Sequence, residues 1–124
     1  MKINTIYNVI TTNKLNESVE FYTKHFGFNI VADVGWYKHL AHDEGIELAF
    51  MEPDHPTQPP MFKPGWDGKG LILSLQVDDI NKAYKEVKAA KLSIHYELTE
   101  EEWGQIHFGI FDPNGIPIDI VAHS

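Results

Sequence analysis

The arrangement of apolar residues in this chain of 124 residues occurs twice in the same order, and this duplication limits the fold more than any other feature. In each half, a stretch rich in β-branched residues precedes a segment with apolar residues at helical spacing, and three further strand-like stretches follow. In the first half we predict a strand at 3–11, a helix at 15–26 and strands at 28–34, 36–42 and 46–51. In the second half we predict a strand at 71–77, a helix at 78–92 and strands at 93–98, 105–111 and 116–122. This order predicts an α+β fold built from two βαβββ modules within one domain, residues 1–124.

Residues at the ends of both predicted helices support their positions. Asn13 or Asn16 can cap the first helix, and Gly27 follows its last aromatic residue as a C-terminal stop. Asp78 or Asp79 is the expected cap of the second helix. Both helices are therefore predicted from local signals as well as from periodicity.

A long proline-rich segment, residues 53–70, separates the first module (1–52) from the second (71–124), and we predict that it is a linker loop. It holds five prolines, three glycines and the apolar residues Met61, Phe62 and Trp66. Loops of this length within a compact domain are uncommon and are often functional. Two interpretations remain open: its aromatic residues fold over a ligand cleft, or they simply cover an apolar edge.

The composition argues against several classes of function. The 18 acidic and 10 basic residues give a formal charge of -8, which repels nucleic acid and anionic membrane surfaces. No stretch approaches the roughly 20 consecutive apolar residues that cross a bilayer, and the N-terminus has no signal-peptide core, so we expect a cytoplasmic protein. The chain has no cysteine, so any metal ligand would be His, Asp or Glu. The acidity has two open interpretations, solubility and the steering of cationic ligands toward a cleft.

Several short motifs, taken together and in order, make the whole chain resemble the vicinal oxygen chelate superfamily. They are Ser18-Val19-Glu20-Phe21-Tyr22 with Phe26-Gly27-Phe28, then Val77-Asp78-Asp79-Ile80, and Asp112-Pro113-Asn114-Gly115 followed by Ile118-Asp119. This superfamily contains glyoxalase I, extradiol dioxygenases, fosfomycin-resistance enzymes and bleomycin-resistance proteins. The resemblance implies two modules whose mixed, largely antiparallel sheets form a cup, with the helices on the outer faces. It also implies a homodimer.

The resemblance further implies where a divalent metal would be held, on the first and last strands of each module. The first-strand positions fall on Tyr7 and Ile72, and the last-strand positions on Ala49 (or Glu47, if the register slips by two) and Asp119. Both of the usual histidines are missing, and isoleucine and alanine cannot coordinate a cation. We therefore expect no metal and no other cofactor at this place, so that the chain is most similar to the bleomycin-resistance-like members that lack a metal.

Strand alternation gives a candidate catalytic pair, because side chains at i and i+2 share a face of a sheet. If the apolar faces of the last two strands pack on a helix, His107 and Asp119 point to the same opposite side. Such a pair can act as a general base or anchor a ligand. A purely structural contact between the two side chains is the other open interpretation.

The remaining candidates are predicted ligand-binding residues. They come from strand alternation, from the linker, and from the Gly-Trp and Trp-Gly pairs at which bleomycin-resistance proteins look similar. They are Tyr7, Trp36, Glu47, Met51, Phe62, Trp66, Ile72, Ser74, Gln76, Trp103 and Phe111. We expect them to bind a small organic molecule, aromatic or cationic, without a metal. The alternative is a lyase or dioxygenase of the glyoxalase type, with a displaced metal on Glu47, Asp119 and His107; whether the chain is an enzyme stays open.

Overall fold

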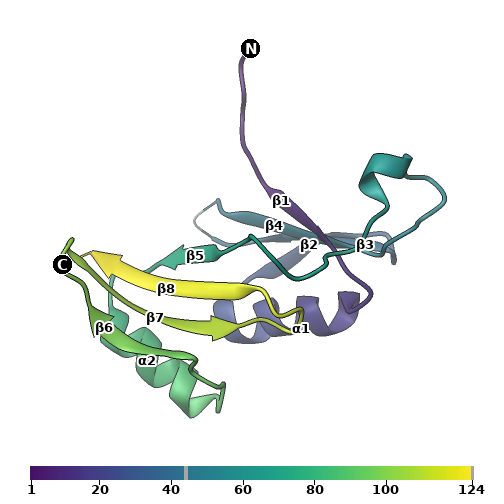
Figure 1. Ribbon diagram of the computed structural model, residues 1–124. Helices are drawn as coiled ribbons and strands as arrows, with labels where there is room; N and C mark the ends of the chain where they lie inside the picture. The colour runs from purple at the N-terminus through teal and green to yellow at the C-terminus, as the bar shows by residue number, and fades with distance from the viewer. Residues whose placement is uncertain (44, 124) are drawn as a thin grey trace. The chain divides into compact units, whose positions relative to one another are not determined.

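The computed structural model describes residues 1–43 and 45–123, and the chain divides into two compact units, Met1–Asp67 and Gly68–Ser124. Each unit contains one long helix and a four-stranded mixed sheet (Figure 1). The predicted α+β fold with two βαβββ modules is thereby confirmed. No helix in the described part of the chain is long and apolar enough to cross a membrane.

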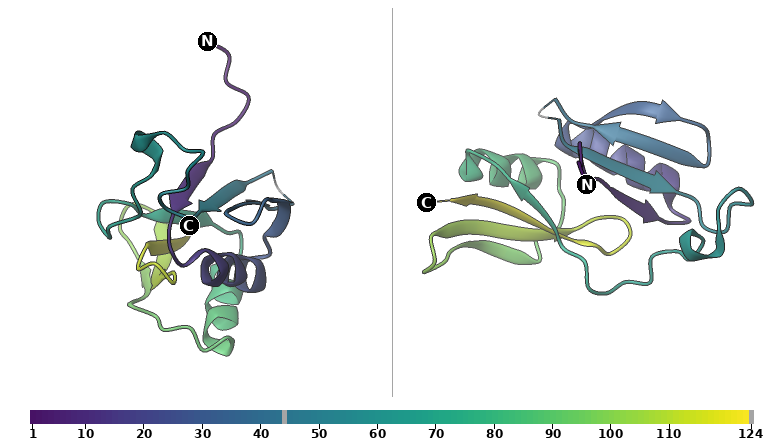
Figure 2. Two further views of the ribbon diagram at one scale, coloured as in Figure 1. Left: turned by 90° about the vertical axis from the view of Figure 1, so that its right-hand side faces the viewer. Right: turned by 90° about the horizontal axis from the view of Figure 1, so that it is seen from above.

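In the first unit the sheet has the strand order β1-β4-β3-β2. Strand β1 runs parallel to β4, and the other neighbours are antiparallel. The elements are β1 (Asn8–Thr11), α1 (Leu15–Phe26), β2 (Asn29–Asp33), β3 (Tyr37–Ala41), β4 (Glu47–Met51) and the short 3₁₀ helix η1 (Pro60–Phe62). Helix α1 covers one face of this sheet and leaves the other face for the site (Figure 2).

The second unit repeats this topology with the strand order β5-β8-β7-β6. Its elements are β5 (Leu73–Gln76), α2 (Ile80–Ala89), β6 (Tyr96–Glu100), β7 (Gln105–Phe111) and β8 (Pro117–His123). Strands β5 and β8 are parallel, and the other pairs are antiparallel. Helix α2 packs on β7 and β8, as α1 packs on β4.

The strand registers define which residues of the two units are equivalent. Val9 lies opposite Ala49 in the first unit, and Ser74 lies opposite Asp119 in the second. Tyr37 lies opposite Met51, which is two residues after Ala49. His107 lies opposite Val121, which is two residues after Asp119. Ala49 therefore corresponds to Asp119, and Tyr37 corresponds to His107.

Each hydrophobic core lies between the helix and one face of its sheet. In the first unit the ring of Tyr22 on α1 lies 5.3 Å from the ring of Phe50 on β4, and neither side chain is exposed. In the second unit Tyr84 on α2 meets Phe108 on β7 edge to face at 5.2 Å. The apolar face predicted from the alternation of β7 and β8 thus packs on the helix, which leaves the opposite face for polar side chains.

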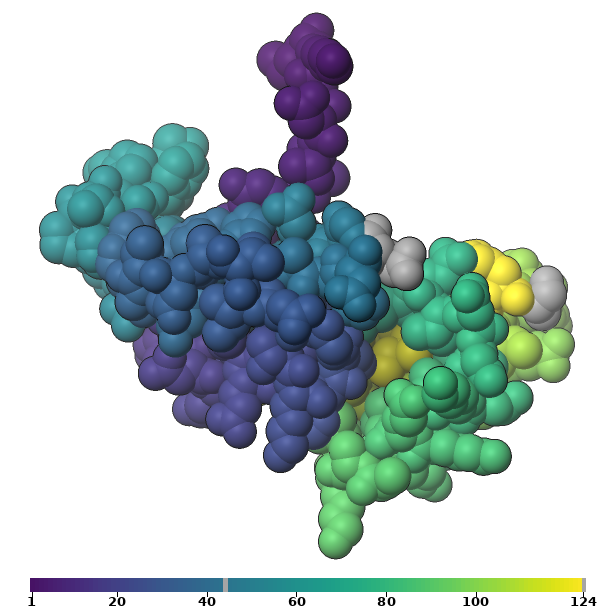
Figure 3. Space-filling model, turned by 180° about the vertical axis from the view of Figure 1, so that it is seen from behind, coloured from purple at the N-terminus to yellow at the C-terminus, as the bar shows by residue number. Residues whose placement is uncertain are grey.

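Three predicted ends differ by three or more residues from the observed ones. Strand β1 begins at Asn8 rather than at residue 3, because β4 begins at Glu47 and offers no partner further along. Residues 3 and 6 are accordingly exposed, and the N-terminal segment projects from the first unit (Figure 3). Helix α2 ends at Ala89 and Lys91 adopts a positive φ of 59°, so β6 starts three residues later than predicted, at Tyr96.

The predicted asparagine cap of helix α1 is also wrong. The N-cap position is Lys14, which makes no side-chain cap, and the Thr12 hydroxyl accepts the Lys14 backbone N–H at 2.9 Å. The side chain of Asn16 instead accepts a hydrogen bond from Lys38 at 3.1 Å. At the other end Gly27 adopts the left-handed conformation with φ of 74°, as its position predicts.

Most of the proline-rich segment belongs to the first unit, which extends to Asp67. The Trp66 backbone N–H donates to the Thr11 carbonyl at 2.7 Å, and the Asp54 N–H donates to the Lys63 carbonyl at 3.1 Å. These bonds return the segment to the end of β1. Its residues therefore lie beside the face of the sheet that α1 leaves uncovered.

Candidate functional site

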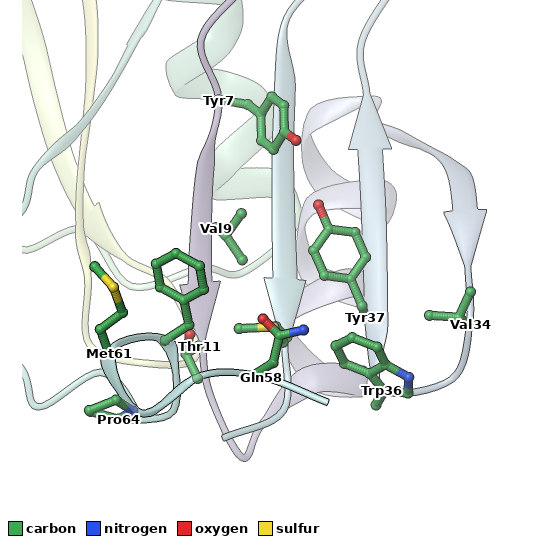
Figure 4. A pocket seen from close by; sticks show the side chains of 11 residues that line it. Tyr7, Val9, Thr11, Val34, Trp36, Tyr37, Gln58, Met61 and Pro64 are labelled. Atoms are coloured by element: carbon green, nitrogen blue, oxygen red, sulfur yellow. The ribbon is translucent and has the colours of Figure 1, made fainter. Parts of the chain in front are cut away.

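The first unit contains a cavity of about 670 Å³, which we call the first-unit cavity. Strand β1, the β2–β3 turn, β3, β4 and the proline-rich segment all contribute to its wall (Figure 4). The lining residues are Tyr7, Val9, Thr11, Val34, Trp36, Tyr37, Met51, Gln58, Met61, Phe62 and Pro64. None of these side chains carries a formal charge, and four of them are aromatic.

The local sequence explains how these side chains reach one place. Tyr7, Val9 and Thr11 alternate along an extended chain and so point to one side of it. Trp36 follows Gly35, whose φ of 90° is in the left-handed region and suits the turn between β2 and β3. The Trp36 ring then stacks on His55 of the proline-rich segment at 3.8 Å, with an interplanar angle of 15°. This stack joins the segment to the sheet beside the cavity.

A chain of polar contacts runs from the cavity wall to a carboxylate. The hydroxyl of Tyr37 lies 2.9 Å from Nδ1 of His39, and Nε2 of His39 lies 2.7 Å from Oε1 of Glu47. Tyr7 packs its ring edge to face on His39 at 4.6 Å. Its hydroxyl and that of Tyr37 point toward one another (Figure 4). We call Tyr7, Tyr37, His39 and Glu47 the tyrosine–histidine chain.

The pKa of the Tyr37 hydroxyl is raised above its ordinary value. Burial is the largest cause, followed by the neighbouring Tyr7 hydroxyl, which interacts with it electrostatically and as a hydrogen-bond partner, and then by the charge of Glu47. All three causes disfavour the phenolate. Tyr37 therefore stays a neutral phenol, which makes it suited to hydrogen bonding and poorly suited to act as a base.

The second unit has a smaller cavity of about 340 Å³ on the equivalent side of its sheet, which we call the second-unit cavity. Its wall is mostly hydrocarbon and aromatic, with a few polar groups. The lining residues are Ile72, His95, Tyr96, His107, Gly109, Ile110, Phe111, Pro117, Ile118 and Asp119.

His107 in this cavity lies between two carboxylates. Its Nδ1 is 2.7 Å from Oδ1 of Asp119, and its Nε2 is 2.9 Å from Oε2 of Glu101. The hydrogen bond to Glu101 is the largest influence on the imidazole pKa, which is raised despite partial burial; Asp119 raises it further. The Tyr96 hydroxyl also donates to Glu101, at 3.2 Å. Both ring nitrogens are thus engaged by acids, and the protonated ring is favoured.

The sequence-predicted site residues are divided between the two units. Four of them, Tyr7, Trp36, Met51 and Phe62, line the first-unit cavity. Four others, Ile72, His107, Phe111 and Asp119, line the second-unit cavity. The remaining five line neither cavity: Glu47, Trp66, Ser74, Gln76 and Trp103.

Two of these five, Glu47 and Trp103, make side-chain hydrogen bonds outside the cavities. Glu47 is bound to His39, and Trp103 is exposed and donates to the side-chain oxygen of Gln105 at 2.8 Å. The indole N–H of Trp66 is buried without a hydrogen-bond partner among the described residues. Glu47 is thus bound to His39 on the neighbouring strand β3, and Trp103, in the turn before β7, is bound to Gln105 at the start of β7.

Sequence reasoning missed three polar partners. Tyr37 and His39 stand two apart on β3 and so share a face, a signal that was available from alternation alone. The pairing of His39 with Glu47 depends on the β3–β4 register, which places His39 opposite Ala49 and diagonal to Glu47. Glu101 follows Glu100 in a run of acids, and nothing in that run distinguishes the one that meets His107.

The residues at the metal positions implied by the resemblance do not fit a divalent cation. Ala49 is fully buried and, like Ile72, offers no donor atom, while Asp119 accepts from His107. With the alternative register, Glu47 contributes a carboxylate that already binds His39. Within the described ranges, no group of three or more His, Asp or Glu side chains is arranged to hold a metal ion.

The comparisons with known proteins agree with this architecture. Residues 2–120 match the family described as the Glyoxalase/Bleomycin resistance protein/Dioxygenase superfamily. No curated protein matches the chain.

Solved structures of similar fold have low sequence identity to the chain. A glyoxalase/bleomycin resistance protein/dioxygenase from Nocardioides has a TM-score of 0.80 at 19% identity, covering 99% of this chain and 85% of that one. Lactoylglutathione lyase from Agrobacterium tumefaciens has a TM-score of 0.78 at 17% identity, with coverage of 98% and 96%. TioX from Micromonospora sp. ML1 has a TM-score of 0.78 at 14% identity, with coverage of 96% and 98%. These likenesses show the fold, and the match over residues 2–120 shows that the chain belongs to the Glyoxalase/Bleomycin resistance protein/Dioxygenase superfamily.

Proposed function

We propose that the chain binds a small organic molecule, aromatic or cationic, in the first-unit cavity and does so without the metal that the resemblance implies. The observation that carries this proposal is the lining of the cavity. Its volume of about 670 Å³ suits a drug-sized molecule, and its wall combines aromatic and aliphatic side chains with a few polar groups. The side chains at the expected metal positions support the same conclusion.

The aromatic residues supply most of the expected affinity. Rings such as Trp36 and Phe62 offer a large apolar area, and their electron-rich faces also attract organic cations. The polar groups, among them the hydroxyl of Tyr37 and the amide of Gln58, fix the orientation of the ligand. Binding of this kind suits a protein that sequesters its ligand.

Tryptophan fluorescence tests the proposal directly. The chain has three tryptophans, and Trp36 is the one in the wall of the first-unit cavity. We expect planar aromatic compounds to quench or shift the emission in a saturable way and to raise the melting temperature of the protein. Trp36→Phe should remove most of the fluorescence response, while the matched change Trp103→Phe at an exposed position should leave it intact. A panel of aromatic and cationic compounds with no saturable response would overturn the proposal.

Acid–base chemistry at the second-unit cavity is a second candidate function, favoured by the 2.7 Å contact between His107 and Asp119. In this alternative the imidazole transfers a proton after leaving one of its two acidic partners. It predicts turnover with a pH profile that follows the raised pKa of His107. His107→Gln should abolish that turnover, and activity that survives the change would contradict this candidate.

In line with the resemblance, we also propose that the chain forms a homodimer, and from its hydropathy pattern we propose that it is cytoplasmic. Light scattering of the purified protein over a range of concentrations tests the dimer. A mass corresponding to one chain of 14.2 kDa at all concentrations would contradict it.

A further inference from the structure

We propose that the first-unit cavity selects ring-sized ligands that place an uncharged hydroxyl or N–H donor against Tyr37, because the tyrosine–histidine chain leaves the Tyr37 oxygen able only to accept hydrogen bonds. This inference rests on the proposed binding function and specifies its ligand class. His39 and Glu47 act in it as positioning residues, through Tyr37.

The direction of the hydrogen bonds is set first at Glu47. An ionised carboxylate can only accept, so the 2.7 Å contact requires a proton on Nε2 of His39. A neutral imidazole carries one N–H, which leaves Nδ1 with a lone pair. The contact of 2.9 Å at Nδ1 is then a hydrogen bond donated by the Tyr37 hydroxyl. Glu47 therefore determines where the Tyr37 proton points.

The same logic extends to the cavity wall. Since the Tyr37 proton is committed to His39, the Tyr37 oxygen can only accept further hydrogen bonds. Both of these protons then point away from the cavity: from Tyr37 to His39, and from His39 to Glu47. What Tyr37 offers a ligand at this end of the cavity is the lone pairs of its phenol oxygen. A bound O–H or N–H group satisfies them, whereas an ether or carbonyl oxygen does not.

The lining also disfavours a charged ligand group at this end. A carboxylate would face these lone pairs, and none of the lining residues carries a compensating charge. The Glu47 carboxylate already binds His39, and the Tyr37 phenol stays neutral, so neither supplies a free counter-ion for an ammonium group. An uncharged donor on an aromatic ring is the chemistry that remains.

Three matched probes test the inference: 2-naphthol as a donor, 2-methoxynaphthalene as an acceptor only, and naphthalene with neither group. Their dissociation constants are measured at pH 8, where an ordinary imidazole is neutral and an ordinary phenol is protonated. We expect 2-naphthol to bind about three- to tenfold more tightly than 2-methoxynaphthalene, the range that one net hydrogen bond supplies.

Two substitutions test the role of the tyrosine–histidine chain. Tyr37→Phe breaks this chain, and the preference for 2-naphthol should fall to within about twofold, because the accepting Tyr37 oxygen is removed. Glu47→Gln replaces an obligate acceptor by an amide that can also donate, so His39 can change tautomer and the Tyr37 proton can turn to the ligand. The preference should then shrink or reverse. Glu100→Gln, the same change at an exposed position on β6, is the matched control and should keep the wild-type preference.

The ratio of affinities separates this inference from a merely structural role. A general loosening of the cavity would weaken all three probes together and leave their ratio unchanged. If no naphthalene compound binds, the proposed function itself fails. If all three bind equally to the wild type, or if the ratio survives both Tyr37→Phe and Glu47→Gln, binding stands and the inference is overturned.

Discussion

Asp119 holds the imidazole of His107 through a contact of 2.7 Å between its Oδ1 and Nδ1 of the ring, while Glu101 holds the opposite ring nitrogen. The first unit has a histidine with a last-strand carboxylate as well, but the pair is displaced. His39 corresponds to Gly109 rather than to His107, since both lie opposite the equivalent residues Ala49 and Asp119. The two units therefore share a topology and have different polar chemistry on equivalent faces.

The two carboxylates should influence His107 unequally. Glu101 is the largest cause of the raised pKa, and its side chain is less exposed than that of Asp119, at 19% against 29%. We therefore expect Glu101→Gln to lower the pKa of His107 more than Asp119→Asn does. NMR titration of the imidazole C–H resonances measures both changes. An equal effect, or a larger one from Asp119→Asn, would contradict this ranking.

The raised pKa of His107 should make stability fall with rising pH. Because the folded state favours protonation of His107, this residue adds to the free energy of unfolding. Its contribution is fully present below the unfolded-state pKa of about 6.5 and is lost as pH rises through the higher folded-state pKa. Urea unfolding of the wild type and of His107→Gln should therefore differ most near pH 6 and converge above the folded pKa. Burial lowers the pKa of His25, so the contribution of His25 to stability changes with pH in the opposite direction. That contribution is the same in the wild type and in His107→Gln. A difference that grows with pH would refute the prediction.

The turn between β7 and β8 depends on the side chain of Asp112, which is buried. Its Oδ1 accepts the backbone N–H of Asn114 at 2.8 Å and that of Ile116 at 2.9 Å. Asp112→Ala leaves both donors without this acceptor and should lower the free energy of unfolding by about 2–3 kcal/mol. Asp112→Asn keeps an acceptor oxygen and should cost about 1 kcal/mol. The exposed Asp43 in the β3–β4 turn provides the control, and Asp43→Ala should change stability by less than about 0.5 kcal/mol.

The donor chemistry at the implied metal positions predicts weak metal binding. We expect purified protein incubated with iron, manganese, nickel or zinc to retain well below one equivalent after dialysis, because Ala49 and Ile72 supply no ligand. Elemental analysis measures the content of the wild type and of Asp119→Ala. Stoichiometric metal in the wild type that is lost in Asp119→Ala would instead favour the displaced metal site and an enzyme of the glyoxalase type.

Local signals predicted much of the fold. Helix α1 begins at Leu15 and ends at Phe26, the predicted residues, because its apolar spacing and Gly27 are both local in the sequence. Strand β7 likewise has its predicted bounds, Gln105–Phe111. The predicted start of β1 is wrong because that strand depends on a distant partner, and the predicted start of β6 is wrong because helix α2 stops at Ala89.

The candidate site was less predictable. Alternation correctly placed His107 and Asp119 on one face, because that property belongs to two strands joined by a tight turn. It did not find Glu101, which reaches the ring from the β6–β7 connection. The pairing of His39 with Glu47 was also missed, because a diagonal contact is set by register and not by spacing along one strand.

The sequence by itself determined the duplicated βαβββ order, the helix positions and which faces of the last strands are apolar, because periodicity is a property of each segment alone. Only the tertiary structure decided which carboxylate meets which imidazole and where the proline-rich segment lies. The Trp36–His55 stack and the bond from Trp66 to Thr11 join residues that are 19 or more positions apart. Such contacts depend on strand register and on the path of a loop, which no local pattern encodes.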